Sequence, residues 1–151
     1  MKLYLVQHGE AKAEAEDPRR PLSVRGENEV RRVAQVAQRM ELAPSKIYHS
    51  GQWRAKQTAE ILAHALRRPV EPVPGLNPND DVHPWANKIS QEKEDFMFVG
   101  HLPFLEKLAS LLIAGQENAR VIFFRYGAII CLERPENQRW GVHWILTPEM
   151  T

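Results

Sequence analysis

The sequence predicts a three-layer α/β/α sandwich with a mostly parallel central sheet and antiparallel strands at its C-terminal end. Short apolar runs typical of strands alternate with helix-like segments through most of the chain, which is the pattern of α/β proteins. Several of these runs are apolar at every position, as expected for strands buried on both faces. The length of 151 residues fits one domain over 1–151, which should bury roughly 68–70% of the surface that its unfolded chain exposes.

Two pairs of a strand and a helix are predicted in the first half of the chain. Residues 3–6 are expected to form a central strand, and Ser23 is expected to cap a helix that ends at Pro44. Residues 47–49 are expected to form a second strand, which Ser50-Gly51 separates from a second helix. The apolar residues of the two helices follow the spacing of one helical face: Val30, Val33, Ala34, Ala37 and Met40, then Ala55, Thr58, Ala59, Leu62, Ala65 and Leu66.

Prolines interrupt the chain between 68 and 84, where five of the eleven fall. Only a short edge strand near Val70, followed by a surface loop, is expected there. The elements predicted after this loop are a brief helix at 85–91, a buried strand at 96–99, and a helix at 104–113 that Gly115 closes.

The C-terminal part favours an antiparallel addition to the sheet. Strands are predicted around 121–124 and 128–133, with a last strand at 140–146. The turns expected between them, at 126–127 and 135–137, are too short for a parallel crossover.

Composition excludes several classes of function. With 20 Lys and Arg against 19 Asp and Glu, the net charge is +1, which gives no basis for sequence-independent binding of nucleic acid. A lone Cys131, expected to be a small buried hydrophobe, cannot form an internal disulfide and indicates a reducing compartment. The apolar start of the chain is cut at Glu10 and Lys12, short of a signal peptide or a membrane span. We therefore expect a cytoplasmic protein with neither a nucleic-acid nor a membrane partner.

Three predicted strands end in residues suited to binding an anion. His8 follows the first strand, Arg54 comes shortly after the second, and His101 follows the strand at 96–99. Ligands of open α/β sheets bind beyond the carboxyl ends of the strands, so these side chains are expected to converge. A guanidinium and two imidazoles suit a phosphoryl group, and a neutral histidine kept so by neighbouring cations can attack phosphorus.

Four segments that carry these residues resemble, in the same order, the motifs of the histidine phosphatase superfamily, which has the phosphoglycerate-mutase-like fold. The compact chain, with no long insertion before His101, is most similar to the SixA type of phosphohistidine phosphatase within it. The four segments are Leu5-Val6-Gln7-His8-Gly9-Glu10-Ala11, Arg19-Arg20-Pro21-Leu22-Ser23 with Gly26, Ser50-Gly51-Gln52-Trp53-Arg54-Ala55-Lys56-Gln57-Thr58-Ala59, and Val99-Gly100-His101-Leu102-Pro103.

The resemblance implies a role for each matched position. His8 would be the nucleophile that is transiently phosphorylated, while Arg54 and His101 would bind the phosphoryl oxygens and stabilise the transition state. Gly9 and Ser50, from the same motifs, are expected at the phosphate site as well.

The chain departs from the family pattern at two positions. The arginine that precedes the nucleophile in the family is Gln7 here, which still donates a hydrogen bond but lacks the charge. Arg19 or Arg20 is a candidate to supply that charge to the phosphate site. Gly51 replaces the usual proline, a change expected to affect only the rigidity of the turn.

The resemblance implies a metal-independent phosphatase that hydrolyses phosphohistidine, on a signalling protein such as a histidine phosphotransfer domain, through a covalent phospho-His8 intermediate. Two alternatives remain. The substrate could instead be a small phosphate ester, or Gln7 could mark a phosphate- or phosphoprotein-binding module that has lost turnover.

No cofactor or metal is expected, because the other histidines lack the spacing of metal ligands. Spacing does not rank the candidates for a general acid, which are Glu10, Asp80 and Asp81. Phosphohistidine needs less help from an acid than an ester does, because a leaving imidazole takes up a proton near neutral pH.

Overall fold

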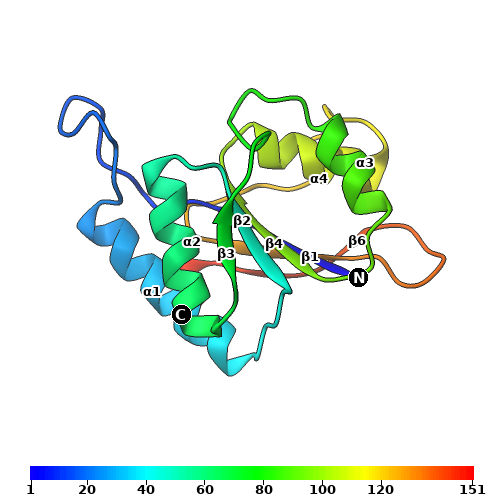
Figure 1. Cartoon of the computed structure of the whole chain (residues 1–151), viewed down its shortest axis with the longest axis horizontal. Coiled ribbons are helices and arrows are strands. Elements are labelled where there is room, and N and C mark those ends of the chain that lie inside the picture. Colours follow the sequence, from blue (N-terminus) through cyan, green and yellow to red (C-terminus); the bar gives the residue numbers. More distant parts are fainter.

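A computed structural model describes residues 1–151 and contains one six-stranded sheet covered by helices on both faces (Figure 1). The strand order is β3-β2-β4-β1-β5-β6, in which β1 to β4 are parallel to one another and β5 and β6 are antiparallel additions. The predicted fold class is confirmed. The strands are β1 (Lys2–Gln7), β2 (Lys46–His49), β3 (Val70–Pro72), β4 (Phe96–Gly100), β5 (Ile129–Glu133) and β6 (Gly141–Leu146).

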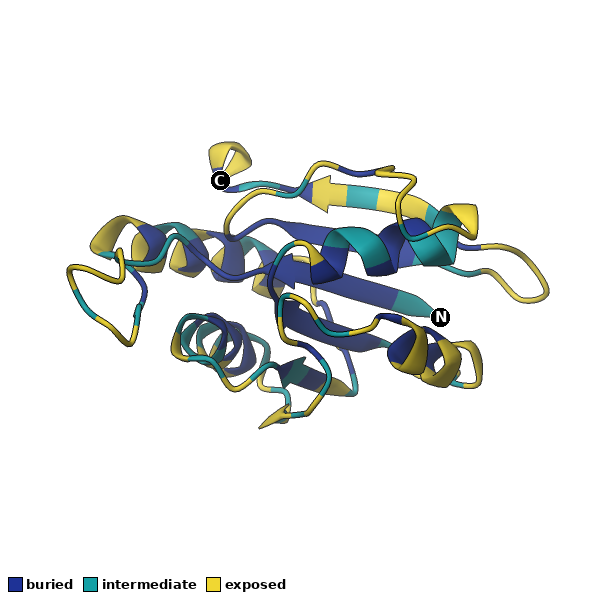
Figure 2. Cartoon of the chain, turned by 90° about the horizontal axis from the view of Figure 1, so that it is seen from above, coloured by how far each residue is buried: buried dark blue, intermediate teal, exposed yellow.

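The two faces of β1 contact different helix layers. Leu3 and Leu5 belong to the core cluster that includes the α3 and α4 side chains, whereas Tyr4 and Val6 belong to the cluster with α1 and α2. Because all four are nearly inaccessible, this strand reads as a continuous apolar run (Figure 2). The helices are α1 (Val24–Arg39), α2 (Trp53–Leu66), α3 (His83–Ser90) and α4 (Phe104–Ala114), and a 3₁₀ turn, η1 (Pro148–Met150), follows β6.

The predicted caps at Ser23 and Gly115 are confirmed, whereas the predicted end of α1 is not. The Ser23 hydroxyl accepts a hydrogen bond from the Gly26 N–H at 3.0 Å, and Gly115 ends α4 with a φ of 77°. The prediction that Pro44 ends α1 is wrong, since the helix stops at Arg39. Glu41 adopts a φ of 58°, which turns the chain inward and buries the next residue, Leu42.

The strand predicted at 121–124 is also wrong. This segment lies in an irregular connection between α4 and β5, in which Ile122 is buried in the core and Phe123 is 91% exposed. Both sides of β5 are already paired, with β1 and with β6, so the preceding segment has no place beside it. Only the turn at 126–127 joins the connection to the sheet.

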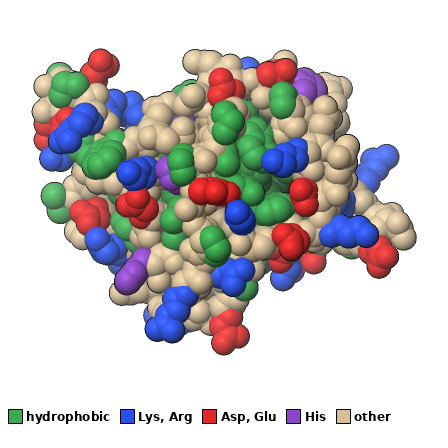
Figure 3. All heavy atoms as spheres, viewed as in Figure 1, with side chains coloured by type: hydrophobic (Ala, Val, Ile, Leu, Met, Phe, Trp, Pro, Cys, Tyr) green, Lys and Arg blue, Asp and Glu red, His purple; other side chains and the backbone are tan.

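Charged side chains of both signs are interspersed on the face in Figure 3, without a continuous basic stripe. This distribution agrees with the balanced composition. None of the helices combines the length and the apolar character that crossing a membrane requires.

Gly26 lies in the first turn of α1 against the loop that follows β1, where an added Cβ would overlap the carbonyl oxygen of Glu10. In an exposed helix interior alanine is more favourable than glycine. At this position, however, the added Cβ would force α1 away from the loop, because the two would overlap. We expect Gly26→Ala to lower the free energy of unfolding by about 1–3 kcal/mol, measured by urea denaturation. Gly141→Ala, where nothing lies within 4 Å of the added Cβ, is the matched control. Equal stability of the two variants would contradict this packing.

Candidate active site

The carboxyl ends of β1, β2 and β4 bring the predicted site residues together. The ring centroids of His8 and His101 lie 5.0 Å apart, and the Arg54 Nε donates to the His8 Nε2 at 3.3 Å. The Ser50 hydroxyl and the His101 Nε2 form a hydrogen bond of 2.6 Å. His8 and His101 are 6% and 1% exposed, so the sheet and the neighbouring loops fix both rings.

One hydrogen bond to the backbone determines which nitrogen of His8 carries the proton. The Nδ1 lies 2.7 Å from the carbonyl oxygen of Gly9, which can only accept, so the Nδ1 carries the proton. The Nε2 of the neutral ring is then left with its lone pair, and it is the nitrogen that faces Arg54. This tautomer suits a nucleophile, because the reactive atom lies beside a cation that can bind a phosphoryl oxygen.

Thr58 links this nucleophile candidate to α2. Its hydroxyl accepts from the Gly9 N–H at 3.0 Å and donates to the carbonyl oxygen of Arg54 at 2.9 Å. The sequence placed Thr58 on the apolar stripe of α2, and it is indeed fully buried, but its polar role went unpredicted. The spacing of four residues from Arg54 was the available signal.

The turn before α2 differs from what a proline would form. Gly51 has a φ of 90°, which proline cannot adopt, and its N–H donates to the His49 Nδ1 at 3.1 Å. The expectation that the change affects only rigidity is therefore incomplete, because the backbone itself follows another path. The Ser50 hydroxyl accepts from the Gln52 N–H at 3.3 Å, which fixes Ser50 beside His101.

Of the two neighbouring arginines, Arg20 is the one whose charge affects the site. The loop that carries both is closed by a bridge between Ala11 and Leu22, and the Arg20 Nε donates to the Lys12 carbonyl at 3.2 Å. The charge of Arg20 lowers the pKa of both His8 and His101. Arg19 instead bonds to Asp17 and lies over the ring of Trp53, with its guanidinium carbon 5.9 Å from the ring centroid.

Burial and clustered cations keep both imidazoles neutral. Burial lowers the pKa of His8 to about 4, with a smaller contribution from Arg54 and Arg20, against the hydrogen bond to Gly9. The pKa of His101 is lowered to about 3, mainly by burial and to a smaller extent by the charges of His8, Arg54 and Arg20. The pKa of Arg54 is itself lowered, by burial and by Arg20. The electrostatics of the site therefore favour the binding of an anion.

Gln7 and Tyr126 lie on the other side of His8. Gln7 is 8% exposed, and its side-chain oxygen has no hydrogen-bond partner. The ring centroid of Tyr126 lies 5.6 Å from that of His8. The Gly127 N–H holds this turn in place by donating to the carbonyl oxygens of Gln7 and His8, at 2.9 and 3.3 Å. The sequence indicated this turn but gave no role to Tyr126.

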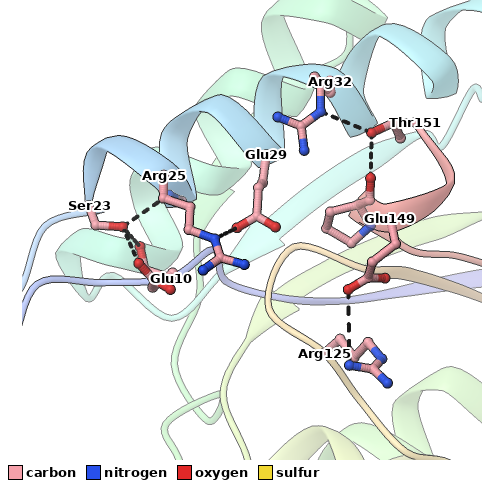
Figure 4. Close-up of polar contacts among 10 residues, drawn as sticks. Glu10, Ser23, Arg25, Glu29, Arg32, Arg125, Glu149 and Thr151 are labelled. Carbon is pink, nitrogen blue, oxygen red and sulfur yellow. Dashed lines mark hydrogen bonds and ion pairs between the residues drawn. The ribbon is translucent and has the colours of Figure 1, made fainter.

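None of the three candidate acids forms a hydrogen bond or an ion pair with His8, Arg54 or His101. The Glu10 carboxylate accepts from the Ser23 hydroxyl at 2.8 Å (Figure 4). Asp80 caps its own loop by accepting from the Asn77 N–H. Asp81 forms an exposed cluster with His83 and Glu117, whose ligand-type atoms lie within 4.8 Å of one another.

Three comparisons relate this arrangement to known proteins. Residues 3–83 match the model of the histidine phosphatase superfamily (branch 1). Phosphohistidine phosphatase SixA of Escherichia coli (strain K12) is 26% identical, over 98% of this chain and 94% of that protein. A structure of the protein histidine phosphatase SixA complexed with tungstate has a TM-score of 0.85 at 25% identity and covers 98% of this chain and 97% of that one. A putative alpha-ribazole-5'-P phosphatase from Escherichia coli (TM-score 0.81, 17% identity, 98% of each chain) shares the fold.

The depressed pKa values of His8 and His101 predict how stability depends on pH. Between about pH 6.5 and pH 4 the unfolded chain binds protons at these histidines and the folded chain does not, so the free energy of unfolding should fall as pH falls. Urea denaturation at pH 7, 6 and 5 should show this loss, and His101→Gln should reduce it. His64→Gln, on the exposed side of α2, is the control and should retain the wild-type dependence. A flat profile in the wild type would contradict buried neutral imidazoles.

Proposed function

Because the chain belongs to the histidine phosphatase superfamily and is of the SixA type, we propose that it hydrolyses phosphohistidine on a protein, such as a histidine phosphotransfer domain. The observation that carries this proposal is the tautomer of His8, whose unprotonated Nε2 faces Arg54 at 3.3 Å. Family membership supports phosphatase activity in general, and the phosphohistidine substrate is the finer step that we add.

In the proposed reaction the His8 Nε2 attacks phosphorus and forms a phospho-His8 intermediate, which water then hydrolyses. Arg54 and His101 bind the phosphoryl oxygens, and Ser50 orients His101 through its short hydrogen bond. Arg20 supplies the second positive charge that Gln7 lacks. Metal ions have no part in this scheme, since the charge of the transition state is stabilised by side chains.

The surroundings of His8 favour a phosphoramidate over an ester. An alkoxide must be protonated as it leaves, and no carboxylate contacts His8, Arg54 or His101. A leaving imidazole takes up its proton near neutral pH without such an acid. The name of the SixA relatives is consistent with this substrate class.

Two alternatives have a specific observation behind them. The neighbour named as an alpha-ribazole-5'-P phosphatase has the same fold, which allows a small phosphate ester as substrate. The uncharged Gln7 allows a phosphate-binding module without turnover. If the wild type is inactive on every substrate and Gln7→Arg restores hydrolysis, the binding module is the better description.

The substrate preference is tested by comparing kcat/KM on a phosphohistidine-containing protein with kcat/KM on phosphoserine and on sugar phosphates. All assays include a chelator, and we expect activity to persist in it because no step requires a metal. We expect a clear preference for phosphohistidine. A preference for esters reverses the ranking, and activity lost on chelation and restored by one divalent ion contradicts the site.

His8 should carry the phosphoryl group during turnover. Brief mixing with substrate and a basic quench should trap an acid-labile phosphate on the wild-type chain, because phosphoramidates survive base. His8→Ala should abolish both the label and turnover, whereas His64→Ala should retain both. Label persisting in His8→Ala means that another residue is the nucleophile.

Arg54 should matter most in the transition state. Loss of one comparable electrostatic donor costs ~10²–10³ in kcat at other active sites, and we expect Arg54→Ala to reach or exceed that range. Arg54→Lys should recover part of the loss, because an ammonium keeps the charge without the two-pronged geometry. With acetyl phosphate as substrate, Gln7→Arg combined with Arg54→Ala should lose less than Arg54→Ala alone. Near-normal kcat in a folded Arg54→Ala variant would place the phosphoryl group elsewhere.

A further inference from the structure

One buried histidine near the phosphoryl site, which His8, Arg54 and His101 form, has no part in the proposed reaction. This residue, His49, ends β2 and is 4% exposed. In the sheet it lies beside Val99 of β4, two residues before His101. Burying an imidazole costs free energy unless its nitrogens find hydrogen-bond partners, so the contacts of the His49 ring indicate what the residue does.

The His49 ring closes a turn around Ser50. Its Nδ1 accepts a hydrogen bond from the Gly51 N–H at 3.1 Å, so the proton of the neutral ring is on the Nε2. Burial lowers the pKa of His49, which keeps the Nδ1 an acceptor at neutral pH. Asn and Asp close tight turns in the same way, by accepting from the N–H two residues later. This N–H exists because position 51 is glycine, whereas a proline would have none.

The residue enclosed in this turn contacts the phosphoryl site. The Ser50 hydroxyl forms the hydrogen bond of 2.6 Å with the His101 Nε2 and accepts from the Gln52 N–H at 3.3 Å. Gln52 is the N-cap of α2 and makes no capping hydrogen bond with its own side chain. Arg54 lies in the first turn of the same helix. The path of the backbone at 49–52 therefore affects both the residue that holds His101 and the start of the helix that carries Arg54.

From these contacts we propose that His49 is a positioning residue of the phosphoryl site, an inference that rests on the proposed function. Its imidazole holds the backbone of Ser50, and the Ser50 hydroxyl holds the ring of His101 where it binds a phosphoryl oxygen. His49 and Gly51 act as a pair, because the glycine supplies the N–H and a φ of 90° and the histidine supplies the acceptor. The role depends on an acceptor at the place of the Nδ1, not on the size of the ring.

The test replaces His49 by side chains that differ in where they place an acceptor. Asparagine puts its amide at the place of the Nδ1, glutamine puts it one atom further from the backbone, and leucine has none. With phosphoimidazole as substrate, we expect His49→Gln and His49→Leu to lower kcat about tenfold, because small displacements of catalytic groups are costly. KM should change less, since His101 acts mainly in the transition state. His49→Asn should retain kcat within about threefold of wild type.

A second arm asks whether His49 acts through Ser50. Ser50→Ala removes the hydroxyl that joins the turn to His101, so adding His49→Leu to it should lower kcat by no more than about threefold further. His64→Leu, the same change at an exposed histidine of α2, is the matched control and should retain the wild-type kcat. Urea denaturation establishes that each variant is folded under the assay conditions.

Equal kcat in His49→Asn and His49→Gln overturns the positioning role and leaves the proposed function intact. Losses from His49→Leu and Ser50→Ala that multiply in the double variant do the same, because they show that the two residues act separately. The asparagine and glutamine variants keep a polar side chain in the buried place, so they decide the matter if His49→Leu fails to fold. Failure of the wild type to hydrolyse both phosphoimidazole and a phosphohistidine-containing protein overturns the proposed function, and the role of His49 with it.

Discussion

The geometry of the site depends on a hydrogen-bond chain that joins the end of β1 to the first turns of α2. Thr58 accepts from the Gly9 N–H and donates to the carbonyl oxygen of Arg54, so one buried hydroxyl ties the two elements together. The carbonyl oxygen of Gly9 in turn accepts a hydrogen bond from the protonated Nδ1 of His8. The bonds of Gly9 to Thr58 and to His8 are buried, so they hold this end of β1 without competition from water. The distance between the nucleophile candidate and its cation is thus set by the packing of the sheet against α2.

Electrostatics follow from that packing. His8, Arg54 and His101 lie close together and shielded from solvent, and no carboxylate contacts them. Their pKa values are lowered for that reason. Such an arrangement costs stability, because clustered cationic groups repel one another when they are buried. Arg20 adds its positive charge to this field from a separate loop.

The fold alone allows several substrates, since proteins named for phosphohistidine and for alpha-ribazole phosphate share it. Discrimination must then come from the side chains next to the phosphoryl site. In this chain Gln7 precedes His8 directly, and the Tyr126 ring lies 5.6 Å from that of His8.

The sequence by itself determined the layered fold, the central place of β1, the caps at Ser23 and Gly115, and the convergence of His8, Arg54 and His101. These depend on local patterns of apolarity and on the rule that parallel strands end at one edge. Only the tertiary structure decided the tautomer of His8, which of Arg19 and Arg20 lowers the pKa of the two histidines, and the contacts that Thr58 and Tyr126 make with the site. It also removed the strand expected at 121–124. Each of these depends on contacts between segments distant in sequence, such as the 49 residues that separate Gly9 from Thr58, and no local pattern encodes which distant group will fill a given contact.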